Sequence, residues 1–199
     1  MIQIPRSLPV LREAVRACRN CDLYLHATQA VPGQGLQSAA MMLVGEQPGD
    51  EEDRQGLPFV GPAGRLLDRA LVDAGIERAS TYVTNAVKHF KFEERGKRRI
   101  HKKPNEAETR ACLPWLEAEI ALVKPRVLVC LGATAAKALF GSAYRVTKQR
   151  GQFTKFESVP FATSTVHPSS ILRMPDEGER HLEYRRFVAD LRIARSAGS

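Results

Sequence analysis

The chain has 199 residues, of which 43% are hydrophobic and 26% are charged, and its formal net charge is +8. This composition excludes a disordered chain and predicts one globular domain, 1–199, with a core of its own. The basic excess favours a polyanionic partner, nucleic acid before membrane. No apolar run reaches the ~20 residues of a membrane span, and Met1–Val10 lacks the apolar centre of a signal peptide. We therefore expect a cytoplasmic monomer without a membrane partner, whose cysteines stay reduced.

Apolar residues follow strand-like and helix-like spacings in turn, which predicts an α/β domain. Strands are expected at 41–44, 82–85, 126–131 and 161–166. Helices are expected at 8–18, 64–74, 105–120, 133–139 and 179–195. Asn105 and Glu108 form a capping-box pattern at the start of the third helix. Because this order fits a mostly parallel sheet, we expect ligands to gather beyond the carboxyl ends of the strands.

The sequence contains four cysteines. Cys18 and Cys21 form a C-x2-C pair, and Cys112 and Cys130 follow at a distance. Four thiolates can complete a zinc site or a [4Fe–4S] cluster, and the spacing does not separate these two. The alternative is that Cys112 and Cys130 are buried core residues, as free cysteines often are. We favour a tetra-thiolate site.

Loops rich in glycine and proline follow the first predicted strand. Glycine at this density lets the backbone approach a ligand closely. Glu46 lies at the strand exit, where a carboxylate in a basic protein indicates catalysis or pocket shaping. Glu51, Glu52 and Asp53 are interpreted as an acidic, solvated turn. Phe59 is either a core residue or a face on which a base stacks.

Two polar residues lie at the ends of later strands. Asn85 offers an amide donor and acceptor that suit the edge of a base, and a turn-forming asparagine is the alternative. His167 precedes Pro168 and Ser169, and taken alone it is better interpreted as a structural histidine. Because parallel strands end at one edge of a sheet, we expect these residues to lie near Glu46.

The segment 97–104, with the sequence KRRIHKKP, places five cationic side chains around His101. The cations are interpreted as a phosphate-binding patch. His101 differs from them, because an imidazole can act as a nucleophile and as a base near neutral pH. The segment is therefore either a DNA-binding loop or the carrier of a catalytic histidine.

Taken together, GEQPG at 45–49, PFVG at 58–61, Thr84-Asn85 and HPS at 167–169, with the four cysteines, resemble the uracil-DNA glycosylase superfamily. The nearest branch is the iron–sulfur branch, which includes the family 4 enzymes. Within it, Gln47 and the segment 97–101 resemble UdgX, because family 4 enzymes generally have alanine in place of this glutamine and lack the Arg-Arg-Ile-His loop. The resemblance implies a three-layer αβα sandwich with a central, mostly parallel four-stranded sheet. It also implies a structural [4Fe–4S] cluster on Cys18, Cys21, Cys112 and Cys130.

The resemblance further implies how a uracil flipped out of single- or double-stranded DNA would be bound. Phe59 would stack on the base and Asn85 would read its edge. Gln47 and Asp50 would line the same pocket. His167 would donate to a uracil carbonyl oxygen as negative charge develops there. Free uracil would be one product.

Resemblance to UdgX implies that the DNA then becomes covalently and irreversibly linked to the protein. His101 would bond the anomeric carbon of the sugar in place of water. Glu46 would orient His101, steady the sugar cation or take the ring proton, and the sequence does not separate these roles. Arg99 would hold the loop or a phosphate. Two alternatives stay open: a hydrolytic family 4 glycosylase with turnover, and a non-catalytic protein that binds DNA lesions.

Overall fold

The computed structural model describes residues 5–198, so residues 1–4 of the N-terminal stretch considered above, and Ser199, lie outside it. Its centre is a sheet of four parallel strands in the order β2–β1–β5–β6, which confirms the predicted parallel sheet. The strands are β1 (Met41–Gly45), β2 (Thr81–Asn85), β5 (Val127–Leu131) and β6 (Phe161–Thr165). After β2 the chain crosses to the other side of β1, so the strand order reverses between β1 and β5. In α/β sheets such a reversal is where ligands bind.

The sheet is buried on both faces, and its two central strands, β1 and β5, are apolar at successive positions. Met41 and Leu43 of β1 belong to one core cluster, and Met42 and Val44 belong to the other. This alternation follows from the two-residue repeat of a strand. The core therefore consists of two apolar layers, one on each side of the sheet.

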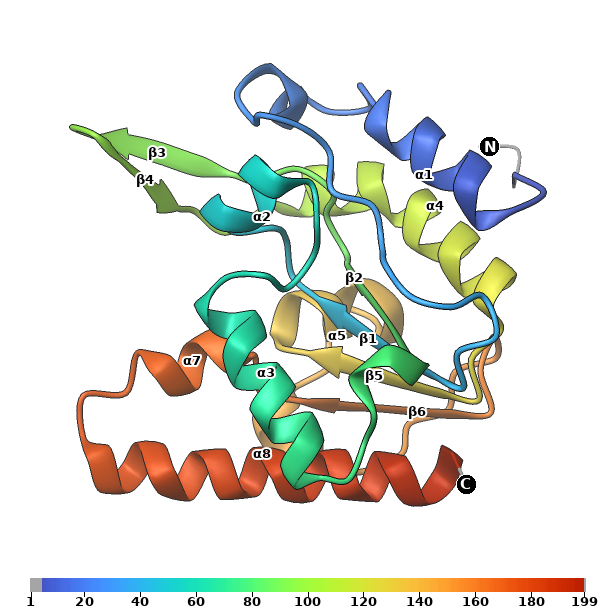
Figure 1. Ribbon diagram of the computed structural model, residues 1–199, viewed down its shortest axis with the longest axis vertical. Helices are drawn as coiled ribbons and strands as arrows, with labels where there is room; N and C mark the ends of the chain where they lie inside the picture. Colours follow the sequence, from blue (N-terminus) through green and yellow to red (C-terminus); the bar gives the residue numbers. More distant parts are fainter. Residues whose placement is uncertain (1–4, 199) are drawn as a thin grey trace.

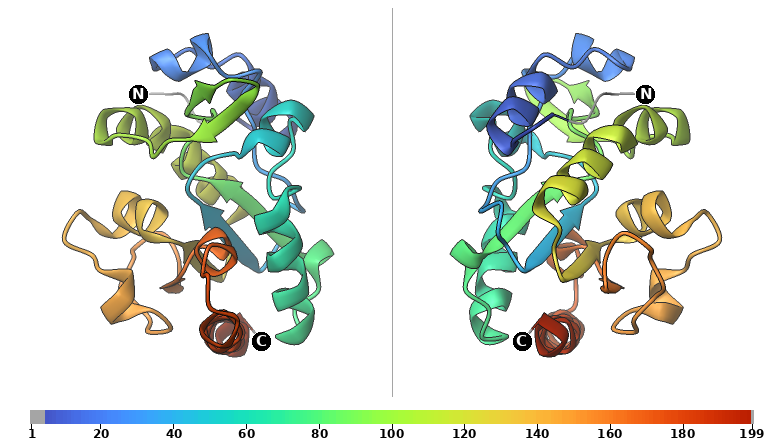
Figure 2. Two further views of the ribbon diagram at one scale, coloured as in Figure 1. Left: turned by 90° about the vertical axis from the view of Figure 1, so that its left-hand side faces the viewer. Right: turned by 90° about the vertical axis from the view of Figure 1, so that its right-hand side faces the viewer.

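Helices cover both apolar layers, which confirms the three-layer αβα sandwich (Figures 1 and 2). One face carries α1 (Leu8–Arg16), α4 (Glu106–Val123) and α5 (Ala133–Phe140). The opposite face carries α3 (Pro62–Asp73), α7 (Pro168–Leu172) and α8 (Glu177–Gly198). Shorter helical segments are η1 (Asp22–Leu25), α2 (Asp50–Gln55), η2 (Arg78–Ser80) and α6 (Val146–Gln149). Within residues 5–198, no helix combines the length and the apolar character needed to cross a membrane.

An antiparallel hairpin projects from the sandwich beside α2 (Figure 1). It consists of β3 (Phe92–Arg95) and β4 (Arg98–His101), and its register pairs Phe92 with His101 and Glu94 with Arg99. Residues 98–101 of the basic segment, for which a loop was one interpretation, therefore form one strand of a hairpin. Gly96 makes the tight turn possible, because its φ of 59° lies in the left-handed region that glycine adopts readily.

The start of α4 confirms the predicted capping box. Asn105 Oδ1 accepts a hydrogen bond from the Glu108 backbone N–H at 2.8 Å, and Glu108 Oε2 accepts one from the Asn105 N–H at 2.7 Å. The Glu108 carboxylate also binds Lys91 Nζ through both oxygens, at 2.9 Å each. One helix cap thus anchors the chain just before β3.

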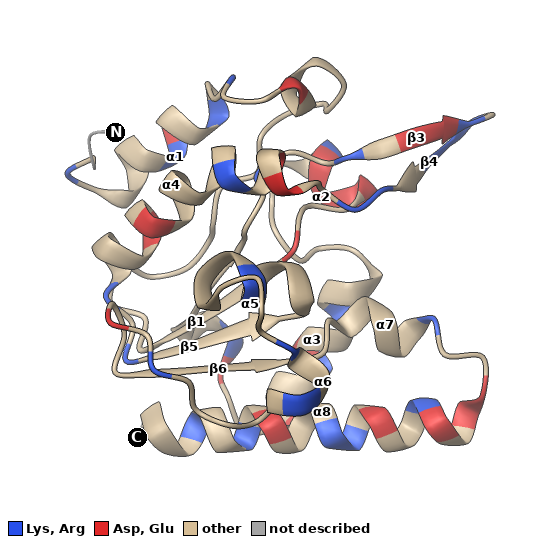
Figure 3. Ribbon diagram, turned by 180° about the vertical axis from the view of Figure 1, so that it is seen from behind, with Lys and Arg blue, Asp and Glu red and all other residues tan. Residues whose placement is uncertain are grey.

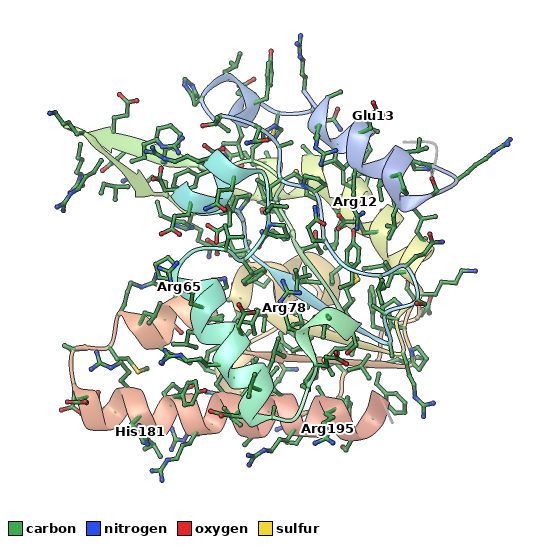
Figure 4. The ribbon with its side chains drawn as sticks, in the orientation of Figure 1. Arg12, Glu13, Arg65, Arg78, His181 and Arg195 are labelled. Atoms are coloured by element: carbon green, nitrogen blue, oxygen red, sulfur yellow. The ribbon has the colours of Figure 1, made fainter. Side chains whose placement is uncertain are left out.

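The first helix is fastened to the loop that leads into the sheet. Arg12 donates from Nε to the carbonyl oxygen of Gly33 at 2.9 Å and from Nη2 to that of Gly35 at 3.0 Å (Figure 4). These bonds satisfy carbonyl groups of a loop that has little regular structure. They also fix α1, and with it the C-x2-C pair that follows.

Candidate active site

The carboxyl ends of β1 and β5 bring Glu46 and Thr134 together at the point where the strand order reverses. The strand arrows in Figure 1 point toward the side where α2, α7 and the hairpin lie. Glu46 directly follows β1, and Thr134 lies in the first turn of α5, just after β5. Thr134 Oγ1 donates to Glu46 Oε2. Thr134 was not among the predicted site residues, although its position just past a strand end was an available signal.

The other carboxylate oxygen of Glu46 faces the hairpin. Glu46 Oε1 lies 3.4 Å from His101 Nε2, and 48% of the His101 side chain is exposed. Burial lowers the pKa of His101, against the opposing effect of Glu46, and the charge of Arg173 lowers it further. His101 is therefore a neutral imidazole near pH 7, with a lone pair on one ring nitrogen.

Phe59 and Asn85 pack against Gly45 at the end of β1. A Cβ on Gly45 would lie 2.6 Å from Phe59 Cζ and would also overlap Asn85 Oδ1, so only glycine fits there. Phe59 has a φ of 58°, a left-handed conformation that costs a residue with a side chain ~1–3 kcal/mol. Its backbone lies directly against Gly64 of α3. This packing holds the Phe59 ring beside the buried Asn85 amide.

His167 stacks on Phe59, with ring centroids 6.2 Å apart and ring planes at 29°. Its Nδ1 accepts a hydrogen bond from the Ser169 backbone N–H at 3.2 Å, so the ring proton lies on Nε2. Burial, aided by the charges of Arg173 and His101, lowers the pKa of His167 to about 4. His167 is therefore a neutral hydrogen-bond donor at physiological pH.

The acidic segment after the first motif loop is the short helix α2, and the prediction of a solvated turn is wrong for two of its residues. Glu52 and Asp53 are buried, whereas 44% of the Glu51 side chain is exposed. Glu52 accepts hydrogen bonds from the backbone N–H of Gly49 at 3.0 Å and of Gly61 at 2.8 Å. The carboxylate thus joins the two glycine loops. A local pattern does not show this, because the donors meet only in the tertiary structure.

Gln47 holds the two ends of the hairpin together. Its Nε2 donates to the carbonyl oxygens of Lys91 at 3.2 Å and Lys102 at 3.0 Å, and its Oε1 accepts from the Lys91 N–H at 3.1 Å. Lys102 directly follows His101 in the sequence. The place of Gln47 in the base pocket stays a prediction, and in this structure its amide hydrogens and amide oxygen bind the hairpin backbone.

Arg99 fastens the hairpin to α2. Its Nε donates to Asp50 Oδ1, and its Nη1 lies 2.6 Å from Asp53 Oδ2. Its guanidinium also lies over the rings of Phe90 and Phe92, at 5.5 and 5.0 Å. Of the two roles expected for Arg99, these contacts are those of a loop anchor. Asp50, which we expected to line the base pocket, serves as a partner of this anchor.

Cationic side chains surround the site on its outer side. Four cationic residues of the basic segment are exposed: Lys97, Arg98, Lys102 and Lys103. Lys102 Nζ pairs across the hairpin with Glu93 Oε2 at 2.6 Å, and Figure 3 shows the acidic residues of β3 beside the basic ones of β4. A groove of about 480 Å³, lined by Lys103, Lys137 and Thr134, lies next to the Glu46 carboxylate. A groove of about 710 Å³ between α3 and α8 contains none of the predicted site residues.

Comparison with known proteins agrees with this arrangement. Residues 32–192 match the family described as the uracil DNA glycosylase superfamily. The chain belongs to this superfamily. It is 36% identical over 180 residues to the type-4 uracil-DNA glycosylase of Sulfurisphaera tokodaii. The matched region covers 85% of this chain and 78% of that protein. It is 37% identical over 175 residues to the type-4 enzyme of Pyrobaculum aerophilum, with 84% and 86% covered, and 36% identical over 184 residues to that of Thermotoga maritima, with 92% and 90% covered.

Three of the four cysteines of this superfamily member lie in one region. Burial raises the pKa of Cys112 to about 12, and the thiols of Cys21 and Cys18 contribute to that rise. Cys18 Sγ accepts a hydrogen bond from Trp115 Nε1 at 3.1 Å, and Cys112 Sγ accepts one from the Lys88 backbone N–H at 3.3 Å. Hydrogen bonds of this kind are typical of sulfurs that bind an iron–sulfur cluster. The three thiols therefore fit part of a cluster site.

The fourth cysteine is placed differently. Cys130 is fully buried in β5, between Val44 of β1 and Ser164 of β6, and its pKa is raised by burial alone. All four cysteines are free thiols. Within residues 5–198, no three His, Cys, Asp or Glu side chains are arranged to hold a single metal ion.

Proposed function

We propose that this protein excises uracil from DNA and then stays covalently and irreversibly linked to the abasic sugar through His101. The observation that carries the proposal is the 3.4 Å approach of His101 Nε2 to Glu46 at the end of β1. The type-4 relatives support excision, since they are uracil-DNA glycosylases. Gln47 supports a function like that of UdgX, because its side chain holds the hairpin that carries His101.

Uracil must leave the base stack before its glycosidic bond becomes accessible, which costs a few kcal/mol. The exposed cations of the hairpin and the adjoining groove would offset this cost by binding phosphates. Phe59 would offer its ring to the flipped base, and the Asn85 amide would pair with the base edge. Because Asn85 is only 2% exposed, a cytosine would leave its buried donor and acceptor unpaired.

As the glycosidic bond breaks, its electron pair passes to the uracil, and negative charge builds on a carbonyl oxygen. His167 would donate a hydrogen bond to this oxygen from Nε2–H, a position that the Ser169 N–H fixes by occupying Nδ1. The sugar becomes cationic at the same time. Glu46, held by Thr134, would place its carboxylate near that charge.

In the capture step, the lone pair of His101 Nε2 forms a bond to the anomeric carbon in place of water. The proton on Nδ1 leaves to solvent and the uracil anion takes a proton, so the products are free uracil and a neutral N-glycosyl imidazole. Hydrolysis of that product would have to expel an imidazolide, a poor leaving group, so the link persists. Glu46 faces the attacking nitrogen and not Nδ1, so it would steady the sugar cation and would not take the proton that leaves Nδ1.

We also propose that the protein holds a [4Fe–4S] cluster with a structural role. Cys18, Cys21 and Cys112 would supply thiolates, and two of these sulfurs already accept N–H hydrogen bonds. When bound, the cluster would tie the segment after α1 to α4. None of the steps above requires an electron.

The test is incubation with single-stranded DNA that carries one uracil, followed by a heated denaturing gel in SDS. The wild-type protein should give a shifted protein–DNA band, and DNA with thymine in place of uracil should give none. His101→Ser should lose the band and release uracil with turnover, because water can then reach the sugar. His181→Ser, on the exposed surface of α8, is the matched control and should cross-link like wild type (Figure 4).

The other outcomes identify the alternatives. Release of uracil in excess over the wild-type protein, without a shifted band, would establish a hydrolytic glycosylase of the family 4 type. Reversible, salt-sensitive binding without base release would establish a non-catalytic lesion-binding protein. The same gel with double-stranded DNA decides the strand preference. A cytoplasmic, monomeric state stays a prediction.

A further inference from the structure

His89, in the segment between β2 and β3, is a buried histidine with an unpartnered ring nitrogen. The residue is 3% exposed. Its Nδ1 is completely buried and has no hydrogen-bond partner among residues 5–198. Buried polar atoms in folded proteins almost always have a partner, so this nitrogen indicates a ligand that completes the site.

The segment that carries His89 contacts the three-thiol region directly. Lys88, its immediate neighbour in the chain, donates its backbone N–H to Cys112 Sγ at 3.3 Å. Cys112 lies in the same region as Cys18 and Cys21, and the thiols of these two residues raise its pKa. The unpartnered imidazole nitrogen and the three thiols therefore come from segments that meet at one place.

Cys130 has none of these relationships. It is fully buried in the central strand β5, between β1 and β6, and burial alone raises its pKa. These are the properties of a core cysteine, the alternative that the sequence analysis left open.

We propose that His89, through Nδ1, is the fourth ligand of the cluster, and that Cys130 is a core residue. This inference rests on the [4Fe–4S] cluster proposed above and changes its ligands to three thiolates and one imidazole. Imidazole replaces thiolate in other protein iron–sulfur centres, where it raises the reduction potential. The physical reason is that a neutral ligand leaves the cluster one unit less negative.

The ligand set is tested by the iron and sulfide content of purified full-length variants. Wild type and Cys130→Val should each hold about four iron atoms per chain. His89→Ala should lose most of the iron and the visible absorption, as should Cys112→Ala, the reference for a lost ligand. His89→Cys should keep the cluster and titrate at a lower midpoint potential than wild type. Thermal melting monitored by circular dichroism identifies the variants that fold.

Loss of iron in Cys130→Val together with full iron in His89→Ala would overturn the proposal. An unchanged midpoint potential in His89→Cys would do the same. If wild type holds zinc and no iron, the cluster proposal fails, but the zinc content of the same variants still decides between His89 and Cys130. Covalent capture is measured separately on the denaturing gel, so its failure leaves the ligand result intact.

Discussion

Gln47 Nε2 donates a hydrogen bond to the carbonyl oxygen of Lys102, 3.0 Å away, in the residue that directly follows His101. The same amide binds Lys91 at the other end of the hairpin. One side chain from the first motif loop therefore positions the strand that carries the proposed nucleophile. This contact gives a physical reason for finding Gln47 and the basic segment in the same chain.

Gln47→Ala should separate capture from excision. The substitution removes three hydrogen bonds, each worth about 0.5–1.5 kcal/mol, and loosens the hairpin. Uracil release should stay near the wild-type rate, while the yield of adduct per uracil released should fall on the order of ten-fold. The denaturing gel measures the ratio of adduct to free abasic DNA. Gln55→Ala, at the exposed end of α2, is the control, and an equal fall in release and capture would contradict this role of Gln47.

Thr134→Val should slow both steps. Valine keeps the shape of threonine but removes the hydroxyl that holds Glu46 Oε2, so the carboxylate loses its fixed orientation. The single-turnover rate of uracil release should fall about 5–30-fold, which corresponds to roughly 1–2 kcal/mol. Thr134→Ser keeps the hydroxyl and should retain most of the rate. A Thr134→Val rate equal to wild type would show that Glu46 needs no such support.

Arg99→Ala and Arg98→Ala should differ in stability although the residues are neighbours. Arg99 pairs with Asp53, whose side chain is 0% exposed, and removing one partner of a buried pair leaves an uncompensated charge. The free energy of unfolding should fall by about 2–4 kcal/mol, which lowers the melting temperature by about 5–15 °C. Arg98→Ala, at an exposed position, should keep its melting temperature and weaken DNA binding, most at low salt. Equal melting temperatures would contradict the anchoring role of Arg99.

The pH dependence follows from the lowered pKa values of two histidines. His167, with a pKa of about 4, stays neutral down to that pH, and His101 protonates only below the ordinary histidine value of ~6.5. Capture should therefore be constant from pH 8 to about 6.5 and decline at lower pH as His101 gains a proton. A single-turnover midpoint above pH 6.5 would contradict this. Arg173→Gln should move the decline to higher pH, because Arg173 lowers both pKa values.

The same two histidines affect stability. Between about pH 4 and ~6.5 the unfolded chain binds more protons at His167 than the folded chain does. The contribution of His167 to the free energy of unfolding should therefore decrease as the pH falls through this window. Urea unfolding of wild type and His167→Gln at pH 5 and pH 7.5 measures it. The difference in stability between the two pH values should be smaller in the variant.

The elements that could be predicted are those whose signals are local. The central strands β1 and β5 follow from short apolar runs. The start of α4 follows from Asn105 and Glu108, which lie three residues apart and bond each other. The expected positions of Glu46 and Asn85 at strand ends also follow, because parallel strands end at one edge of a sheet. The hairpin and α2 were missed. Their stability depends on contacts between distant segments, such as that of Arg99 with Asp53.

The sequence by itself determined the α/β class with a mostly parallel sheet, the motif residues and the presence of a histidine among cations. The reason is that apolar periodicity, helix caps and residue type are properties of the chain alone. Only the tertiary structure decided what each polar side chain binds: Gln47 the hairpin, Glu52 two glycine loops and Thr134 the Glu46 carboxylate. It also revealed that the buried Nδ1 of His89 has no partner among the described residues, and that Cys130 lies in the core. Partners far apart in the sequence meet only when the sheet is formed, and so their pairing is not written in any local pattern.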